Sequence, residues 1–286
     1  MSRHSVQAWL LLLPALCLLM AFTYFPTVQT VWRSVFSLGT QPSDFTLENY
    51  QFMMEDDVLH QVIVNTALYA LFTVPLAIGI ALVMALWVNS QMKGRGWLRL
   101  AYFTPTVLPM IAVANIWLFF YSPEIGLLNQ LLGLFEHRGY NWLGDPDLSL
   151  YCLMVITVWK EAGFFMIFYL AALQSLSPEL YQAASIEGAG RWTQFRRITF
   201  PLLMPTTLFI LVNAVLNAFK MVDHLFILTK GGPNNASNLL LYYIYENAFS
   251  FFDTAYAASL TLLLLLALVA LALLQFGVFE RRTHYR

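Results

Sequence analysis

The amino-acid sequence predicts an all-α, polytopic membrane protein that crosses the bilayer six times. Of its 286 residues, 59% are hydrophobic and only 11% are charged, and the mean hydropathy is +0.64. Soluble globular domains carry about 25% charged residues, so this composition excludes an ordinary soluble protein. The chain also contains long uncharged stretches, and a spanning helix needs about 20 mostly apolar residues.

Six stretches meet this requirement. The first runs well past the length of a signal peptide's apolar region and ends at no small-residue cleavage site, so we expect a retained helix. The fourth stretch carries Lys160 and Glu161, and the fifth carries Lys220 and Asp223, but apolar residues surround each pair. The first span is expected at residues 5–32, with the others inside 58–92, 100–123, 151–175, 202–227 and 254–279.

The distribution of lysine and arginine predicts the orientation of these spans, because cytoplasmic loops are enriched in both. On the side expected to face outward, the loops hold only three positive residues among many acidic ones: Arg33, Arg138 and Lys230. Both termini are therefore predicted to be cytoplasmic, as is the loop between spans four and five. The positive residues expected on that side are Arg3, Lys93, Arg95, Arg99, Arg191, Arg196, Arg197, Arg281, Arg282 and Arg286.

The sequence lacks the motifs of several enzyme classes. It contains no P-loop, no H-E-x-x-H and no G-x-S-x-G, and its five histidines are scattered, so we predict no catalytic residue and no metal site. Cys17 and Cys152 both lie in apolar runs, where we expect buried small hydrophobes rather than a disulfide. No long basic or acidic tail suggests nucleic acid as a partner.

The loop between spans four and five has the signals of two short helices. Ser177-Pro178-Glu179 is a favourable helix start, and the helix is expected to continue through Ile186. Gly188 and Gly190 then allow a left-handed cap or a bend. A second helical run is expected from Arg191 to Phe200, ending near Pro201.

Ala183, Ala184 and Gly188 give this element a surface of small residues. Such a surface allows a foreign protein to approach the backbone closely. An amphipathic linker held at the membrane by its arginines is the alternative. Because a linker of this length needs neither small residues nor paired glycines, docking is favoured.

The same stretch resembles the EAA loop of ABC importer permeases that work with a solute-binding protein. The family pattern is E-A-A, three residues, G, about nine variable positions and then I-x-L-P. The chain has Gln182 to Ala189, then Phe195, Ile198, Phe200 and Pro201, with Pro205 beyond. TKGGPNNAS at 229–237 and the following LLYYIYENAF also look like the sugar and glycerol-phosphate branch, so the resemblance covers essentially the whole chain.

The resemblance implies that residues 177–201 form short amphipathic coupling helices that dock on a separate cytoplasmic ATPase. Gln182 replaces the glutamate that names the motif, which removes a charge that the family is expected to use on the ATPase, and Glu187 conservatively replaces a common aspartate. Two alternatives remain open: Gln182 forms a hydrogen bond instead, or Glu179 or Glu187 supplies the negative charge. The residues implied in coupling are Glu179, Gln182, Ala183, Ala184, Glu187, Gly188, Ala189, Gly190 and Arg191.

Polar residues within the spans are candidates for a translocation path, because ionisable groups in a bilayer are costly and are often functional. Asn213, Asn217, Lys220 and His224 recur at spacings of four, three and four, which predicts one helical stripe. Hydrogen bonds between helices and snorkelling of Lys220 are the alternative reading, as is a local Lys220–Asp223 pair. The candidate set is Lys160, Glu161, Asn213, Asn217, Lys220, Asp223 and His224.

By resemblance, the chain is a permease subunit of an ATP-driven importer of a sugar or oligosaccharide in the bacterial inner membrane. A glycerol phosphate or glycerophosphodiester importer is the second candidate, and an ion-coupled carrier is a remote third. The implied partners are a second permease, two ATPase subunits that bind ATP and Mg²⁺, and an external binding protein; the chain itself is expected to be no enzyme and to hold no cofactor. Residues 1–57 are expected to form the first span and first outer loop, 58–280 the permease core, and 281–286 a cytoplasmic tail.

Overall fold

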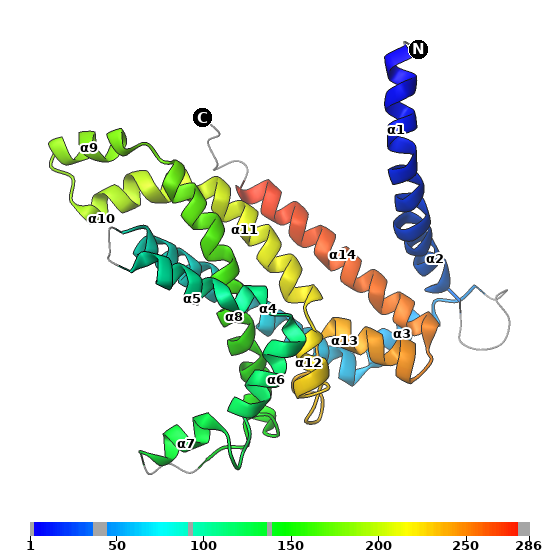
Figure 1. Ribbon diagram of the computed structural model, residues 1–286. Coiled ribbons are helices and arrows are strands. Elements are labelled where there is room, and N and C mark those ends of the chain that lie inside the picture. Colours follow the sequence, from blue (N-terminus) through cyan, green and yellow to red (C-terminus); the bar gives the residue numbers. More distant parts are fainter. Residues whose placement is uncertain (1–2, 37–44, 91–93, 136–138, 280–286) are drawn as a thin grey trace. The chain divides into compact units, whose positions relative to one another are not determined.

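The computed structural model describes residues 3–36, 45–90, 94–135 and 139–279 (Figure 1). Helices and turns form this part of the chain, together with one isolated antiparallel bridge between Phe36 and Phe45, which confirms the all-α prediction. Tail residues 281–286 lie outside the described residues, as do Lys93 and Arg138. The cytoplasmic placement of both termini stays a prediction.

Among the described residues, five helical stretches are long and apolar enough to cross a membrane, and a bent pair of helices makes a sixth. The predicted number of six therefore holds when the bent pair counts as one span. The five stretches are Trp9–Arg33, Asp57–Asn89, Pro146–Ser175, Arg191–Leu228 and Thr254–Gln275. The bent pair consists of α5 (Arg95–Val107) and α6 (Met110–Phe120).

The bent pair corrects the expectation of an uninterrupted third span. The axes of α5 and α6 differ by 103°. Proline disfavours a helical conformation at the preceding residue, and Leu108, which precedes Pro109, has an extended ψ of 134°. The hydrophobic run was long enough for one helix, but Pro109 divides it.

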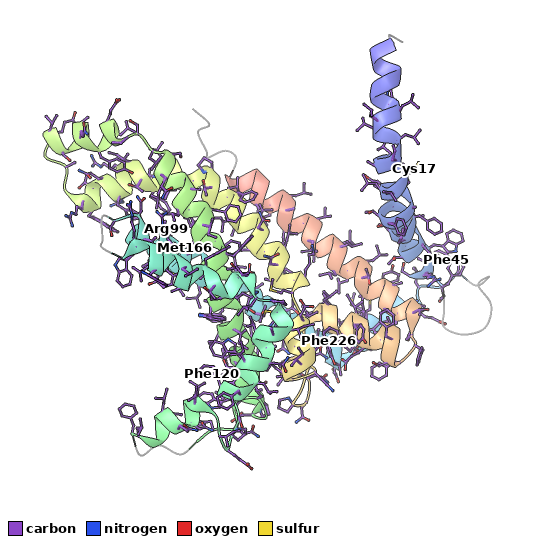
Figure 2. The ribbon with its side chains drawn as sticks, viewed as in Figure 1. Cys17, Phe45, Arg99, Phe120, Met166 and Phe226 are labelled. Atoms are coloured by element: carbon purple, nitrogen blue, oxygen red, sulfur yellow. The ribbon has the colours of Figure 1, made fainter. Side chains whose placement is uncertain are left out.

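The chain forms two compact units, and the first comprises residues 1–59 and 243–267. Its first span consists of α1 (Arg3–Leu19), a π-helical segment (Met20–Tyr24) and α2 (Phe25–Arg33). No residue of the span Trp9–Arg33 is buried, and the Cys17 side chain is exposed (Figure 2). The expected burial of Cys17 is therefore wrong, because its side chain lies on an exposed helix, whereas Cys152 in the other unit is buried.

Asp56 organises the polar interior of the first unit, between α3 (Glu48–Glu55) and α4 (Asp57–Asn89). Its Oδ1 accepts from the backbone N–H groups of Val58 and Leu59, both at 3.0 Å. Its Oδ2 accepts from the hydroxyls of Tyr243 at 2.7 Å and Tyr256 at 2.5 Å. Burial by itself raises the pKa of this carboxyl, but the hydrogen bonds from Tyr256, Tyr243 and the backbone outweigh it, so the pKa lies below its ordinary value.

The second unit, residues 60–242 and 268–286, contains most of the apolar core. Within it, α5 packs on α8 (Pro146–Ser175), α8 packs on α11 (Phe200–Lys220), and α6 packs on α12 (Asp223–Leu228). Ala77, Ala81 and Ala85 are buried along α4, where small side chains allow close helix packing. Figure 1 shows α9 (Pro178–Ile186) and α10 (Arg191–Gln194) at one end of this unit and α7 (Leu127–Gly133) at the other.

The remaining helical segments are short, apart from α14. A π-helical segment, Phe195–Thr199, joins α10 to α11. Helix α13 (Leu240–Tyr245) continues into a π-helical segment (Glu246–Ser250), and α14 (Thr254–Phe279) follows.

Candidate functional site

The loop between α8 and α11 forms a helix, a glycine turn and a second helix. Ser177 Oγ accepts from the N–H of Glu179 at 3.2 Å, which caps α9 as the sequence predicts. At the other end, the N–H of Gly188 bonds to Ser185 O and the N–H of Ala189 bonds to Ala184 O. These two bonds form a Schellman motif, and Gly188 occupies its left-handed position with φ +76°. Gly190 has φ −67° and serves as the N-cap of α10.

The second helix of the loop differs from the prediction, because it does not end near Pro201. Helix α10 passes through the π-helical segment into α11 without a break, and Pro201 lies in the first turn of α11. Proline is tolerated in a first helical turn, and the π-helical segment directly before it adjusts the hydrogen bonding there. Consequently, one continuous helix connects the loop to the fifth span.

Hydrogen bonds between the two arms hold the loop in this shape. Gln194 Nε2 donates to Ser185 Oγ and to Ala189 O, each at 3.0 Å. The hydroxyls of Tyr181 and Thr199 are 2.9 Å apart. These bonds connect α9 and the glycine turn to α10 and the π-helical segment that follows it.

The outer surface of the loop is open and partly apolar. Ile186 is 88% exposed and Trp192 is 71% exposed, although both are large apolar residues. Gln182, Ala183 and Glu187 are also exposed, whereas Ala184 and Ala189 are half-buried. No described atom lies within 4 Å of a Cβ built on Gly188 or Gly190. Exposed apolar side chains beside open backbone are typical of a protein-binding surface.

The predicted stripe of polar residues in the fifth span is interrupted. Helix α11 ends at Lys220 and α12 begins at Asp223, so His224 lies on a different helix from Asn213 and Asn217. The stripe prediction assumed an unbroken helix, which Met221 ends with an extended ψ of 91°. Asn213 donates to Phe209 O of its own helix at 2.7 Å. Lys220 and Asp223 are both exposed, and no ion pair between these two described residues is present.

Glu161 and Asn217 connect α8 to α11. The Asn217 side chain donates to Glu161 Oε2 at 2.8 Å, and Glu161 is 6% exposed. Lys160, the adjacent residue, has different partners at the C-terminal end of α5: its Nζ donates to Pro105 O and Leu108 O. The two charges thus point to different neighbouring helices, as the angle of roughly 100° between successive helical residues requires.

A second polar cluster lies one turn from Glu161 along α8. Tyr69 of α4 bonds to Thr157 of α8, and the Tyr69 hydroxyl lies 3.1 Å from His224 Nε2. His224 is fully buried, and its Nδ1 has no hydrogen-bond partner among the described residues. Sequence reasoning missed Tyr69 and Thr157. The available signal was the four-residue spacing of Thr157 and Glu161, which places both on one face of a helix.

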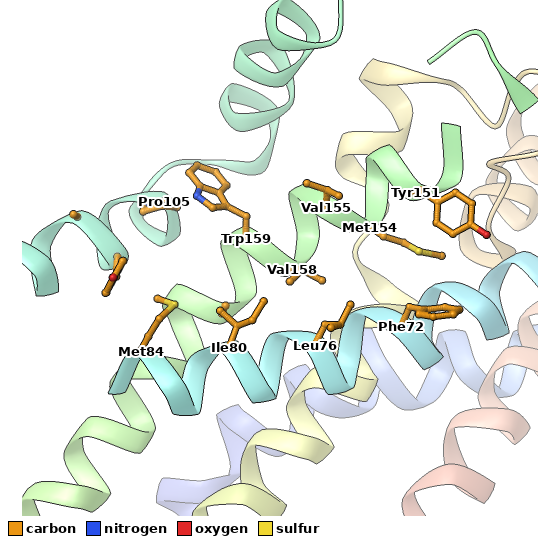
Figure 3. Close-up of a pocket in the computed structure, with 13 residues that line it drawn as sticks. Phe72, Leu76, Ile80, Met84, Pro105, Tyr151, Met154, Val155, Val158 and Trp159 are labelled. Carbon is orange, nitrogen blue, oxygen red and sulfur yellow. The ribbon is translucent and has the colours of Figure 1, made fainter. Parts of the chain in front are cut away.

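The cavities near these residues do not provide a route for a solute. The void beside Glu161 and Asn217 has a volume of about 10 Å³, at the lower limit for one water molecule. A larger cavity of about 570 Å³ lies between α4, α5 and α8, where Leu76, Val158 and Trp159 line it (Figure 3). Its lining is almost wholly apolar, which suits neither sugar hydroxyls nor a phosphate. Glu161 and Asn217 are therefore closed off from a solute in this conformation.

A metal site is not indicated, since no group of three or more His, Cys, Asp or Glu side chains in the described part of the chain is arranged to hold an ion.

Comparison with known proteins identifies the family. The chain is 32% identical over 261 residues to the sulfoquinovosyl glycerol transport system permease protein SmoG of Agrobacterium fabrum, covering 90% of this chain and 85% of SmoG. It is 28% identical over 288 residues to the sn-glycerol-3-phosphate transport system permease protein UgpA of the same organism, covering 99% and 97%. A crystal structure of a bacterial ABC transporter that imports alginate contains a similar chain, with a TM-score of 0.86 and 22% identity over 99% of this chain and 98% of that one. The family model of binding-protein-dependent transport system inner membrane components matches residues 77–285. The chain belongs to this family and is a multi-pass inner-membrane permease subunit of an ABC importer.

Proposed function

We propose that this permease moves a carbohydrate-like solute, which an extracytoplasmic binding protein delivers to it. The observation that carries the proposal is the exposed α9–α10 loop, with its EAA-like residues, in a chain of the binding-protein-dependent family. The names of SmoG and of a lactose permease, LacF of Rhizobium radiobacter, refer to carbohydrate-containing solutes, which supports a sugar or oligosaccharide. The name of UgpA supports glycerol phosphate as the second candidate.

The α9–α10 loop is the proposed docking site for a cytoplasmic ATPase subunit, which binds ATP and Mg²⁺. Ile186 and Trp192 supply exposed apolar area, and the open backbone at Gly188 admits a close approach. Glu179 in α9 and Glu187 at its C-cap are both exposed, and they keep negative charge near the position where Gln182 replaces a glutamate. Because α10 continues into α11, a displacement of the loop is transmitted directly to the fifth span.

The proposed translocation path runs along Glu161, Asn213, Asn217, Lys220, Asp223 and His224. Glu161 and Asn217 bond to each other in this conformation, so separation of α8 from α11 exposes both polar groups to a solute. Alternating access requires two such states with different contacts. A second permease, two ATPase subunits and the binding protein complete the proposed assembly.

Reconstitution tests this function. We reconstitute the permease in proteoliposomes together with the ATPase and the second permease encoded next to it. The binding protein is added outside, and ATP is enclosed in the lumen, where the ATPase faces. We expect uptake of a labelled sugar or oligosaccharide that requires both ATP and the binding protein. Uptake of glycerol phosphate alone would favour the second candidate. Gradient-driven uptake by this chain without ATPase would refute the proposal and establish an ion-coupled carrier.

A further inference from the structure

The break between α5 and α6 removes hydrogen-bond donors from the backbone inside a membrane span. In a continuous helix, the carbonyl of Pro105 accepts from the N–H of residue 109, four positions later. Residue 109 is proline and has no N–H, so this carbonyl has no helical donor. The carbonyl of Leu108 lies outside the helix, because Leu108 is extended. Within a bilayer, such groups need partners from the protein itself.

Lys160 supplies both missing bonds. Its Nζ donates to Pro105 O at 3.0 Å and to Leu108 O at 2.5 Å, and the residue is only 8% exposed. An ammonium group has three N–H donors, so it bonds to two carbonyls at once. Its positive charge also lies at the C-terminal end of α5, the negative end of the helix dipole.

Gly163 allows α5 to lie close enough for these bonds. It follows Lys160 by three residues, which places the two on the same side of α8. A Cβ at Gly163 would lie 2.2 Å from Tyr102 O, a backbone atom of α5. Any larger residue would therefore push α5 away from α8. Lys160 and Gly163 together form a seat for the last turns of α5.

The same turn of α8 also bonds to α11, the helix that continues from the α9–α10 loop. Glu161, between Lys160 and Gly163, bonds to Asn217 of α11, and α11 is continuous with α10. Adjacent residues of α8 thus fix the bend of the third span on one side and the position of α11 on the other.

We propose that Lys160 and Gly163 clamp the break in the third span, and that Lys160 is a positioning residue rather than a group that binds solute. The clamp keeps the angle between α5 and α6 at the value that the importer needs for its transport cycle. The role in transport rests on the proposed importer function, but the clamp itself does not depend on which solute is carried.

The bend is measured in the assembled transporter in lipid nanodiscs, with spin labels on α5 and α6 at the exposed positions Leu100 and Phe119 and the native cysteines replaced. We expect Lys160→Met and Gly163→Ala each to shift or broaden the distance distribution, and Lys160→Arg to preserve it in large part, because arginine keeps several donors. Lys220→Met, which removes a lysine that does not bond to the break, is the matched control and should leave the distribution unchanged. A wild-type distribution in Lys160→Met would overturn the proposal.

Transport kinetics separate positioning from solute binding. For Lys160→Met we expect a fall of about tenfold in the maximal uptake rate, with the half-saturating concentration of binding-protein-loaded solute changed by less than about twofold. Lys160→Arg should recover most of the rate. A large rise in half-saturation at unchanged maximal rate would contradict the positioning role and make Lys160 a solute contact.

A second variant keeps the test decisive if Lys160→Met does not assemble. Pro109→Ala restores an N–H opposite Pro105 O, so the third span is able to straighten and no longer needs the lysine. We expect the double variant Lys160→Met/Pro109→Ala to assemble with a longer label distance and to transport poorly. Failure of the double variant to assemble would overturn the proposal. Absence of uptake by the wild-type assembly would instead refute the proposed function, and the distance measurements would still test the clamp.

Discussion

Gly188 provides the sharpest test of the α9–α10 loop as a docking surface. Its φ of +76° is in the left-handed region, where a residue with a Cβ costs about 1–2 kcal/mol. No described atom lies within 4 Å of a built Cβ, so a side chain at this position begins in open space. A cost of about 1–2 kcal/mol is small beside the roughly 5–15 kcal/mol that stabilises a typical domain. Gly188→Trp should therefore insert and fold.

The comparison with Gly188→Ala isolates the effect of bulk. Both variants carry the same backbone cost, but only tryptophan extends into the space that a docked ATPase would occupy. A third variant, Gly188→Asn, reduces the backbone cost, because asparagine tolerates the left-handed region. Any difference between the alanine and tryptophan variants thus reports on the partner surface rather than on the fold of the loop.

The assay measures three quantities in one preparation. These are the amount of permease in the membrane, co-purification of the ATPase, and ATP hydrolysis stimulated by the solute-loaded binding protein. We expect Gly188→Trp to reach wild-type membrane levels while stimulated hydrolysis and uptake fall by more than about tenfold, which corresponds to about 1.4 kcal/mol or more of activation free energy. Gly188→Ala should retain most activity. Wild-type uptake in Gly188→Trp would refute the docking surface, and equal losses in both variants would assign the effect to backbone geometry instead.

Three further substitutions test the polar interior by thermal unfolding and amide hydrogen exchange. Asp56→Asn keeps an N-cap acceptor but removes the charge that two tyrosine hydroxyls bind, so we expect a loss of about 2 kcal/mol. The pKa of Asp56 is depressed in the folded protein, so its contribution to the free energy of unfolding is fully present above the ordinary aspartate pKa of about 3.9. This contribution is lost as the pH falls through the folded-state pKa. A dependence of stability on pH that is the same in Asp56→Asn as in the wild type would contradict this. Asn217→Leu leaves the buried Glu161 without its amide donor and should lower the unfolding midpoint, whereas adding Glu161→Gln should recover part of the loss; simple additivity would argue against the pair. Asn65→Leu removes bonds of 2.8 and 3.1 Å to the backbone of the 229–238 turn and should speed amide exchange there, and unchanged protection would refute that anchoring.

Features that depend only on residues close together in the sequence were predictable from the sequence alone. The length of each apolar run predicted six spans, and the structure has five candidate helices plus one bent pair. Ser177 and Gly188 predicted where α9 begins and ends, because caps involve residues only a few positions apart. Pro109 was a signal for the break in the third span, but the long apolar run around it led to the prediction of one unbroken helix.

The partners of the buried polar groups required the folded chain. Lys160 bonds to carbonyls 55 and 52 residues away, and Asn217 bonds to Glu161 at a separation of 56. Sequence periodicity describes which face of one helix a residue occupies, but it contains no information on which other helix packs against that face. The same limit explains Cys17, whose apolar surroundings in the sequence suggested burial although its side chain is exposed. Composition and local spacing thus predicted a helical membrane protein with a two-helix loop, and the motif resemblance predicted a permease. Helix packing alone determined that Lys160 bonds to the broken span and Glu161 to the helix leading to that loop.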